Sequence, residues 1–327
     1  MTNQIIPIRF FGFENSFKDV TLLIENYLRS DMISFKINDE NFLYEGIDFY
    51  WDFFQKYHLD KKNLNILILH EPESYYPLQY KNKILKNFHL VIPIGIGRAK
   101  RLNSEIYLPF IPYENSYRMH PNNIPTPFES IKFHSKSGIV MISGNKFSAS
   151  NASNYGLRRR IAAQMNNDRD NLQLIGRWNL PFQDEIGNRY AAIKYALLCG
   201  NLPKLTEALS YLFFKFDVKE EHVKNKLDAL LPFKYCIVIE NESDWVTEKI
   251  FDALKSGCIP IYIGADLNFI PKVLESSIIV PRDGNEVYSI RKIVTNFELY
   301  DVKLKNLRSE EHTSELQSRQ YLVCRLL

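Results

Sequence analysis

The chain has 327 residues, and its 41 lysines and arginines exceed its 38 aspartates and glutamates by a net charge of +3. This small basic excess argues against a nucleic-acid-binding protein, because such proteins cluster cations to neutralise many phosphates. No stretch approaches the roughly 18 uncharged apolar residues of a membrane-spanning helix, and the N-terminus lacks a basic segment followed by an apolar one. We therefore expect a cytoplasmic protein.

Strands and helices are predicted to alternate in the first part of the chain. Ile5–Gly12 and Asn65–Leu69 have the apolar pattern of strands, and Phe17–Arg29 has the pattern of a helix between them. Phe88–Ile96 is predicted to be a further buried strand. This alternation is typical of a parallel α/β sheet.

A Pro- and Asn-rich passage, His120–Pro127, interrupts the alternation, and Gly138–Ile142 begins a new strand. The length suits two domains of about 150 residues each. We place the boundary near residue 135, which gives an N-terminal domain of residues 1–134 and a C-terminal domain of residues 135–307.

The C-terminal domain contains a predicted βαβ unit. Tyr235–Ile239 and Ile259–Ile263 are apolar, mostly β-branched runs, as in parallel strands buried on both faces. An acidic loop, 240–244, and a short amphipathic helix that ends at Gly257 connect them. Ligands of such units bind beyond the carboxyl ends of the strands, where a helix N-terminus favours an anion. Glu248 and Lys249 fall in the first turn of that helix.

Residues 308–327 do not look like natural protein sequence. Residues 308–318 translate the DNA of a widely used sequencing-library adapter, and residues 322–327 translate its continuation. We therefore exclude this segment from fold analysis. Cys199, Cys236 and Cys258 precede it without a CxxC pair, and we interpret them as small apolar residues in a reducing compartment.

The βαβ segment resembles the nucleotide-binding signature of the family 10 glycosyltransferases, the α-1,3/4-fucosyltransferases. The matching residues are Glu240, Asn241, Trp245, Val246, Thr247, Glu248, Lys249, Gly257, Pro260, Ile261, Tyr262 and Gly264. The resemblance implies an α/β protein of GT-B architecture, in which two Rossmann-like domains face each other across a cleft. The N-terminal domain would bind the acceptor and the C-terminal domain GDP-fucose, with no metal or cofactor required.

The resemblance also implies roles for residues of the C-terminal domain. Lys249 and Arg158 would bind the departing diphosphate, since an arginine fork can grip two phosphate oxygens. Glu248 would accept hydrogen bonds from ribose or sugar hydroxyls, and Trp245 would line the GDP pocket, where the family more often has Tyr. Arg159 and Arg160 are expected to point into solvent. The remaining matched residues assigned to donor binding are Glu240, Asn241, Val246 and Thr247.

The general base is predicted in the N-terminal domain, directly after the strand that ends at Leu69. Glu71 and Glu73 match the two acids of a G-E-N-E-S-P motif found in bacterial members of the family. This chain departs from that motif at His70, Pro72 and Tyr75, so it keeps the acids without their usual neighbours. Either carboxylate could accept the proton of an acceptor hydroxyl.

The resemblance implies an inverting fucosyltransferase that transfers L-fucose from GDP-fucose to a glycan hydroxyl. An α-1,3 linkage to GlcNAc or Glc of a surface polysaccharide, such as lipopolysaccharide, or of an oligosaccharide is favoured, and the acceptor and the linkage, 1,3 or 1,4, stay open. The missing anchor indicates a bacterial-type member, cytoplasmic or peripheral on the inner membrane through C-terminal residues beyond this sequence. One alternative is a GT-A-like, metal-dependent transferase, because Asp168 and Asp170 form a D-x-D motif in a predicted solvated turn. Another is a nucleotide-sugar-binding protein that has lost catalysis.

Overall fold

The structure is a computed structural model that describes residues 6–11, 35–37, 46–51, 59–69, 73, 77–94, 96–106, 131–148, 150–167, 169–179, 197, 202–213, 215–220, 223–244, 246–266, 275–282 and 284–307. The chain divides into two compact units, Met1–Phe110 (unit 1) and Ile111–Leu327 (unit 2). The predicted boundary near residue 135 stays a prediction, because residues 107–130 lie outside the described ranges. The same holds for the predicted helix 17–29 and for the tail 308–327.

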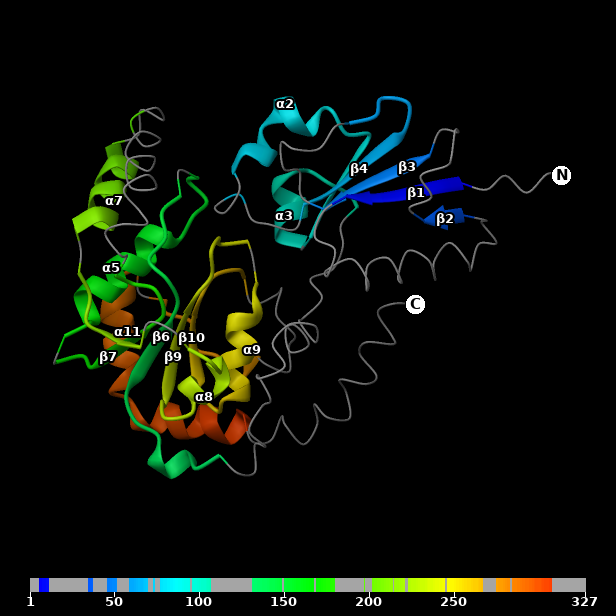
Figure 1. Ribbon diagram of the computed structural model, residues 1–327. Helices are drawn as coiled ribbons and strands as arrows, with labels where there is room; N and C mark the ends of the chain where they lie inside the picture. The colour runs from blue at the N-terminus through cyan, green and yellow to red at the C-terminus, as the bar shows by residue number, and fades with distance from the viewer. Residues whose placement is uncertain are drawn as a thin grey trace. The chain divides into compact units, whose positions relative to one another are not determined.

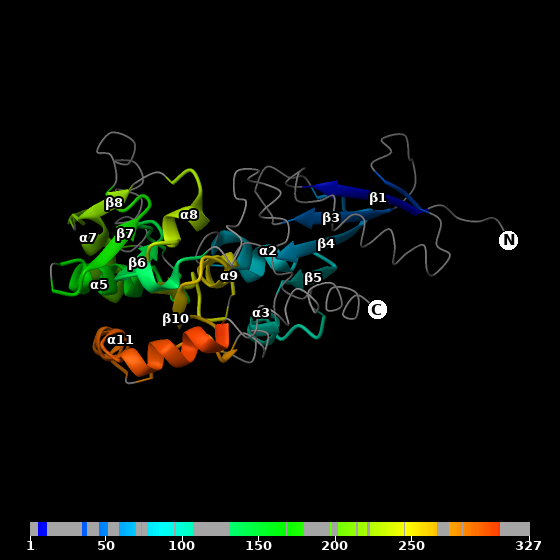
Figure 2. The ribbon, with the colours of Figure 1, turned by 90° about the horizontal axis from the view of Figure 1, so that it is seen from below.

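Unit 1 is built on a parallel sheet whose described strands follow the order β2-β1-β3-β4-β5. Figure 2 shows β1, β3 and β4 running side by side. Tyr50 of β3, Leu67 and Leu69 of β4, and Phe88 form a buried core cluster in this unit. The elements are β1 (Ile6–Phe11), β2 (Phe35–Ile37), β3 (Ile47–Trp51), β4 (Leu64–Leu69), η1 (Pro77–Tyr80), α2 (Asn82–Leu85), β5 (Leu90–Pro93) and α3 (Ile96–Arg101).

Unit 2 is built on a second parallel sheet, of order β10-β9-β6-β7-β8 (Figure 1). Its strands are β6 (Ile139–Ile142), β7 (Leu172–Ile175), β8 (Val218–Glu220), β9 (Tyr235–Ile239) and β10 (Ile259–Ile263). Its helices are η3 (Phe133–Ser135), α5 (Tyr155–Met165), α7 (Leu202–Phe213), α8 (Lys226–Leu230), α9 (Glu248–Lys255) and α11 (Glu286–Val294), and a further helical segment spans 297–307.

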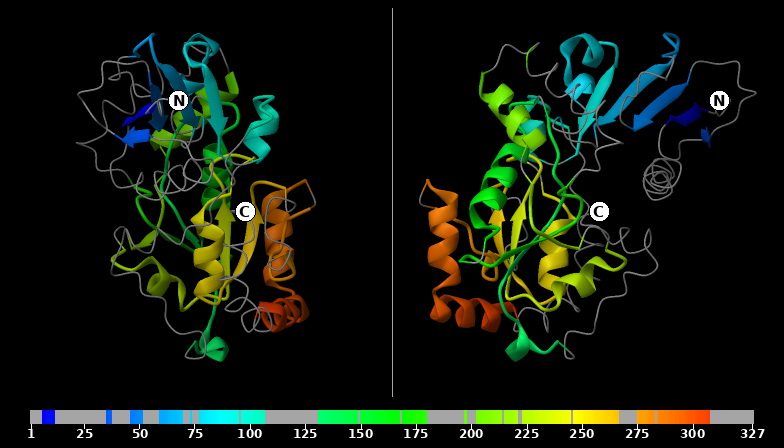
Figure 3. Two further views of the ribbon diagram at one scale, coloured as in Figure 1. Left: turned by 90° about the vertical axis from the view of Figure 1, so that its right-hand side faces the viewer. Right: turned by 60° about the vertical axis from the view of Figure 1, so that its left-hand side comes forward.

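Helices cover both faces of the sheet in unit 2. In both views of Figure 3 the strands lie between α9 and α11, and α5 contacts α11 whereas α8 contacts α9. Every residue of β9 is buried, which explains its continuous apolar sequence, YCIVI. Cys236 and Cys258 are free, buried thiols in this core, as predicted. Burial raises the pKa of Cys258 to about 11, so its thiol is inert at neutral pH.

The predicted α/β class is confirmed, and the two strands of the βαβ unit have the predicted bounds. The prediction of one strand over 88–96 is wrong at its end, because β5 stops at Pro93 and α3 begins at Ile96. A proline is tolerated there, since β5 is the edge strand. Sequence analysis missed β3, where Asp48 interrupts the apolar pattern. None of the described helices is long and apolar enough to cross a membrane.

Candidate functional site

The strand order of unit 2 locates a switch point between β6 and β9. The chain starts at β6, proceeds to β7 and β8 on one side, and then returns to β9 and β10 on the other. Helices that follow strands on opposite sides of such a point leave a crevice beyond the carboxyl ends of the strands, where ligands of open α/β sheets bind. The loops after β6 and β9 are therefore the first place to look for a site.

Backbone contacts join these two loops directly. Ser153 pairs with Glu242 in an isolated antiparallel bridge, and the Asn154 amide donates to the Asn241 carbonyl at 2.9 Å. Asn154 is the N-cap of α5, so its position fixes where that helix begins. The amino end of α5 is thus held against the carboxyl end of β9.

Glu240, the first residue after β9, is fully buried and organises the start of α9. Its Oε1 accepts from the Thr247 amide at 2.8 Å, and its Oε2 accepts from the Thr247 hydroxyl at 2.6 Å. Oε2 also lies 3.3 Å from Lys249 Nζ. The Glu240 carboxylate thereby contacts both the N-cap residue Thr247 and Lys249 in the first turn of the helix.

The amino end of α9 combines two sources of positive potential. Thr247 caps the helix, its Oγ1 accepting from the Lys249 amide at 3.4 Å. Lys249 Nζ returns to the same hydroxyl at 2.9 Å, so the ammonium group is fixed beside the helix N-terminus. A helix N-terminus and an adjacent lysine both favour a bound anion.

Arg158, in the first turns of α5, is a buried arginine that makes no ion pair with any described carboxylate. Its Nη2 donates to the Ile239 carbonyl at 2.8 Å and to Asn241 Oδ1 at 3.2 Å. The guanidinium carbon lies 5.1 Å from the ring centroid of Tyr155. Nε is buried without a hydrogen-bond partner among the described residues. Burial lowers the pKa of Arg158, because it desolvates the cation, and the nearby Tyr155 and Glu240 offset this effect only in part.

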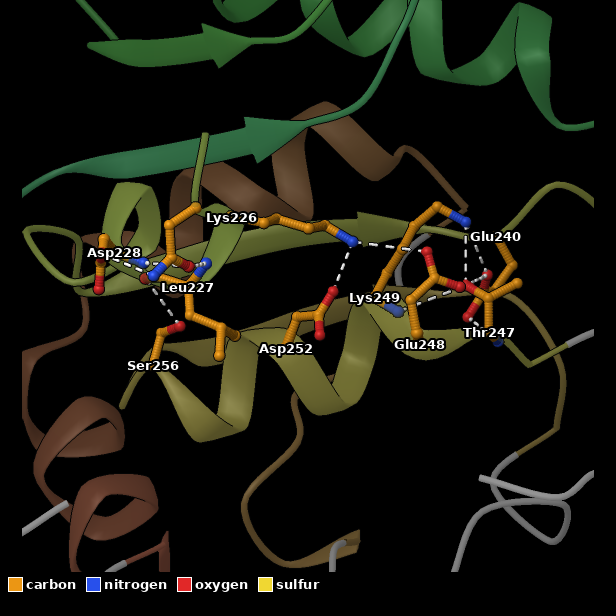
Figure 4. A network of polar contacts seen from close by, with 10 residues as sticks. Lys226, Leu227, Asp228, Glu240, Thr247, Glu248, Lys249, Asp252 and Ser256 are labelled. Atoms are coloured by element: carbon orange, nitrogen blue, oxygen red, sulfur yellow. Dashed lines mark hydrogen bonds and ion pairs between the residues drawn. The ribbon is translucent and has the colours of Figure 1, made fainter. Parts of the chain in front are cut away.

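Glu248, in the same first turn of α9, has its ion-pair partner on α8. Its Oε1 lies 3.4 Å from Nζ of Lys226, the first residue of α8, and Lys226 also forms an ion pair with Asp252 one turn along α9 (Figure 4). Burial alone would raise the pKa of Glu248, but the ammonium groups of Lys249 and Lys226 outweigh it and hold the pKa at about 2. Glu248 is therefore ionised at neutral pH.

The predicted donor-binding residues fall into three groups. The structure brings Arg158, Asn241 and Lys249 together around Glu240 and Thr247 at the switch point. Val246 is buried next to them, with 6% of its surface exposed, so its side chain belongs to the core. Trp245 lies outside the described residues.

The expectation for the neighbouring arginines is wrong in one case. Arg159 is 2% exposed and forms an ion pair with Glu207 of α7 at 3.0 Å, whereas Arg160 is exposed and pairs with Glu286 at 3.2 Å. Successive residues of a helix point about 100° apart, so Arg159 can face α7 while Arg158 faces β9. The sequence does not show which element packs against each face of α5.

Of the predicted bases, Glu71 lies outside the described residues and Glu73 lies in unit 1. The Glu73 side chain is 32% exposed, and its Oε2 is 3.5 Å from Arg101 Nη1 of α3. The carboxylate is therefore accessible to solvent and already has one cationic neighbour.

Asp170, the second acid of the D-x-D motif, forms an ion pair with Arg291 of α11. Both oxygens of Asp170 bind the guanidinium of Arg291, at 2.9 and 2.7 Å, and this contact lowers the pKa of Asp170. Asp168 lies outside the described residues. The described part of the chain holds no group of three His, Cys, Asp or Glu side chains that could bind a metal ion.

A hollow of about 600 Å³ lies at the carboxyl end of β10. Tyr262 and Gly264 line it after β10, Arg282 lines it from the segment before α11, and Glu286 and Ser289 line it from α11 itself. The site around Glu240 adjoins it, since a Cβ placed on Gly264 would come within 2.6 Å of Glu240 Cγ. Sequence analysis missed this hollow and also Lys226, because nothing in the local pattern links residue 226 to 248.

Comparisons with known proteins show a likeness in fold. No family model and no curated protein matches the chain. A solved α1,3-fucosyltransferase is 16% identical, covers 93% of this chain and 81% of that chain, and has a TM-score of 0.50. An α1,3-fucosyltransferase with GDP is 15% identical, covers 93% of this chain and 82% of that chain, and has a TM-score of 0.48. Anabaena HepE in complex with UDP and glucose is 9% identical, covers 98% of this chain and 99% of that chain, and has a TM-score of 0.47. The chain therefore has the α/β fold with two parallel sheets seen in GT-B glycosyltransferase structures.

Proposed function

We propose that this protein is an inverting glycosyltransferase that transfers L-fucose from GDP-fucose to a hydroxyl of a glycan. The observation that carries the proposal is the buried guanidinium of Arg158, which has no carboxylate partner among the described residues and lies at the switch point beside Lys249. Buried charges are ordinarily paired, so a cation left with neutral contacts at a ligand-binding edge favours an anionic ligand.

The chemistry of the proposed ligand fits this part of the molecule. A diphosphate needs hydrogen-bond donors and positive charge, which the N-terminus of α9, Lys249 and the remaining N–H groups of Arg158 can supply. Glu248, ionised and partly exposed, is an acceptor for ribose or sugar hydroxyls. The choice of GDP-fucose over other nucleotide sugars rests on the sequence resemblance over residues 233–265.

In the proposed reaction the acceptor oxygen forms a bond to the anomeric carbon as the bond from that carbon to the diphosphate oxygen breaks. The acceptor proton passes to a carboxylate, for which Glu71 and Glu73 are the candidates. Lys249 and Arg158 stabilise the charge that develops on the departing GDP. No step requires a metal ion, which is also the expectation from the resemblance.

The donor assignment is tested by incubating the purified protein with GDP-fucose, GDP-mannose and UDP-glucose, a panel of β-galactoside acceptors, and EDTA. We expect GDP release and a fucosylated product by mass spectrometry with GDP-fucose alone. Turnover only with another donor would overturn the choice of fucose. Turnover abolished by EDTA would favour the metal-dependent alternative, and tight GDP binding without product would favour the binding protein.

The site is tested by Lys249→Ala, with Lys255→Ala in the last turn of the same helix as the matched control. Loss of a charge-assisted hydrogen bond costs about 1.5 to 3 kcal/mol, so GDP affinity should fall roughly ten- to a hundredfold in the first variant only. Equal affinity of both variants, measured by calorimetry, would remove Lys249 from the site.

The base is tested by Glu71→Gln and Glu73→Gln, measured side by side. Loss of a general base lowers turnover on the order of a hundred- to ten-thousandfold, while GDP affinity should be unchanged because the acid touches the acceptor hydroxyl. Near wild-type turnover in both variants would defeat the assignment. A location in the cytoplasm or at the inner membrane surface belongs to the same proposal, and fractionation of source cells tests it.

A further inference from the structure

Glu248 and Lys249 are neighbours of opposite charge in the first turn of α9, yet they are not each other's ion-pair partner. Lys249 Nζ extends to Glu240 and Thr247 at the end of β9, whereas the Glu248 carboxylate extends to Lys226 on α8. Figure 4 shows the two side chains turned to these separate partners. Each of the two adjacent charges therefore has its own counter-ion from another element.

The contact to Lys226 is built into the packing of α8 on α9. Asn225 caps α8, its Oδ1 accepting from the Leu227 amide at 3.0 Å, and the Leu227 carbonyl accepts from Ser256 Oγ at 3.1 Å. These contacts hold the backbone at the start of α8, and with it Lys226, beside α9. From there it bridges Glu248 and Asp252, which lie one helical turn apart on the same face of α9.

Loss of the Lys226 charge would leave Lys249 as the cation that acts on Glu248 among the described residues. The Glu248 side chain is 38% exposed, so it is free to change rotamer. A carboxylate that turned to the Lys249 ammonium would place a second negative charge beside Glu240 and would repel a diphosphate at the same place. The bridge to Lys226 prevents this collapse.

We propose that Lys226 is a positioning residue that holds the Glu248 carboxylate away from Lys249, so that the ammonium group stays available to an incoming diphosphate. This inference rests on the proposed function, since it assigns a task to residues of the proposed donor site. Lys226 itself touches no substrate in this assignment. It acts through Glu248 alone.

The test uses inorganic pyrophosphate as the probe, because it reports on the diphosphate site without contacts to ribose or fucose. Calorimetry would compare the full-length wild type with Lys226→Met, Lys226→Arg, Glu248→Gln and the double variant Lys226→Met/Glu248→Gln. We expect Lys226→Met to weaken pyrophosphate binding about three- to tenfold and Lys226→Arg to retain most of the affinity. In the Glu248→Gln background, Lys226→Met should have no further effect, because no carboxylate is left to collapse.

Asp252→Asn is the matched control, since it removes the other half of the same bridge and loosens α8 on α9 without freeing Glu248. Its pyrophosphate affinity should equal that of the wild type. An equal loss in Asp252→Asn would overturn the inference in favour of a merely structural role, and an equal loss in both Glu248 backgrounds would overturn it in favour of a simple charge effect. A wild type that binds neither pyrophosphate nor GDP would instead overturn the proposed function.

Discussion

Each unit has an arginine at its sheet, partly exposed Arg9 in unit 1 and buried Arg158 in unit 2, and the two have different partners. In unit 1, Arg9 of β1 binds both carboxylate oxygens of its strand partner Asp48, at 2.7 and 2.8 Å, and Asn63 donates a third hydrogen bond at 3.0 Å. In unit 2, Arg158 donates to a carbonyl and an amide oxygen, and no described carboxylate pairs with it.

The location of the two groups differs as well. Asp48 is the second residue of β3, so the pair with Arg9 lies near the amino end of that strand. Arg158 meets β9 at its last residue, Ile239, at the carboxyl end and beside the switch point. An arginine that contacts the sheet is thus no sign of a site by itself. Its significance comes from the absence of a direct ion pair with any described carboxylate, at the edge of the sheet where ligands bind.

The largest expected effect comes from Arg158→Met, which keeps much of the side-chain volume and removes the charge. GDP affinity should fall about ten- to a hundredfold, because a charge-assisted donor is lost. Stability should stay the same or rise, since a desolvated cation without a direct ion pair is removed. Calorimetry with GDP and urea unfolding would measure the two quantities. If the variant unfolds more easily and still binds GDP normally, then Arg158, like Arg9, stabilises the fold and does not bind the ligand.

The same substitution in unit 1, Arg9→Met, should give the opposite pattern. It leaves the Asp48 carboxylate, which is 1% exposed, without its cation. Breaking a fully buried pair costs about 3 to 5 kcal/mol, and because Arg9 is 39% exposed we expect about 2 kcal/mol. GDP affinity should remain that of the wild type. Unchanged urea unfolding would show that the pair is not what stabilises these strands.

A smaller effect is expected from Gly264→Ala, which crowds Glu240. The added Cβ would lie 2.6 Å from both Glu240 Cγ and the Tyr262 hydroxyl. Such overpacking typically costs about 1 to 3 kcal/mol, and it should displace the carboxylate that holds Thr247 and Lys249. Stability and GDP affinity should fall together, unlike in either arginine variant. Loss of stability with normal GDP affinity would show that the site tolerates a shift of Glu240.

The smallest effect is a pH dependence that comes from Glu248. Its pKa is about 2 in the folded protein against an ordinary value of 4.5, so its ionised form favours folding above pH 4.5 and this contribution is lost as the pH falls toward 2. Glu248→Gln should therefore destabilise the protein at pH 7 and have little effect near pH 2.5. Urea unfolding at both values measures the difference. An equal penalty at both pH values would mean that Glu248 does not act through its charge.

Much of the site could be predicted from local sequence. The strands on either side of the signature helix have the bounds that their apolar runs indicate, and Thr247 precedes the helix as a capping residue should. Lys249 lies at the helix N-terminus as expected. Local patterns succeed here because each depends on neighbours within about one helical turn or one strand.

Other residues of the site could not be predicted in this way. The donor-binding role of Glu240 stays a prediction, and the structure adds that its buried carboxylate contacts Thr247 and Lys249. Arg159 looked solvated, but it pairs with Glu207 of α7. In each case the partner lies on another element, and the sequence states only that the side chain is charged.

By itself, the sequence determined the α/β class, the βαβ unit and the chemical types of residue at the amino end of α9, because hydrophobic periodicity and capping act over short separations. The tertiary structure decided which charges meet. Arg158 reaches Ile239 across 81 positions, and Lys226 reaches Glu248 across 22, because the order of strands in the sheet and the packing of α8 on α9 bring these segments together. The strength of an ion pair depends on the distance between the two charged groups, and the fold sets that distance.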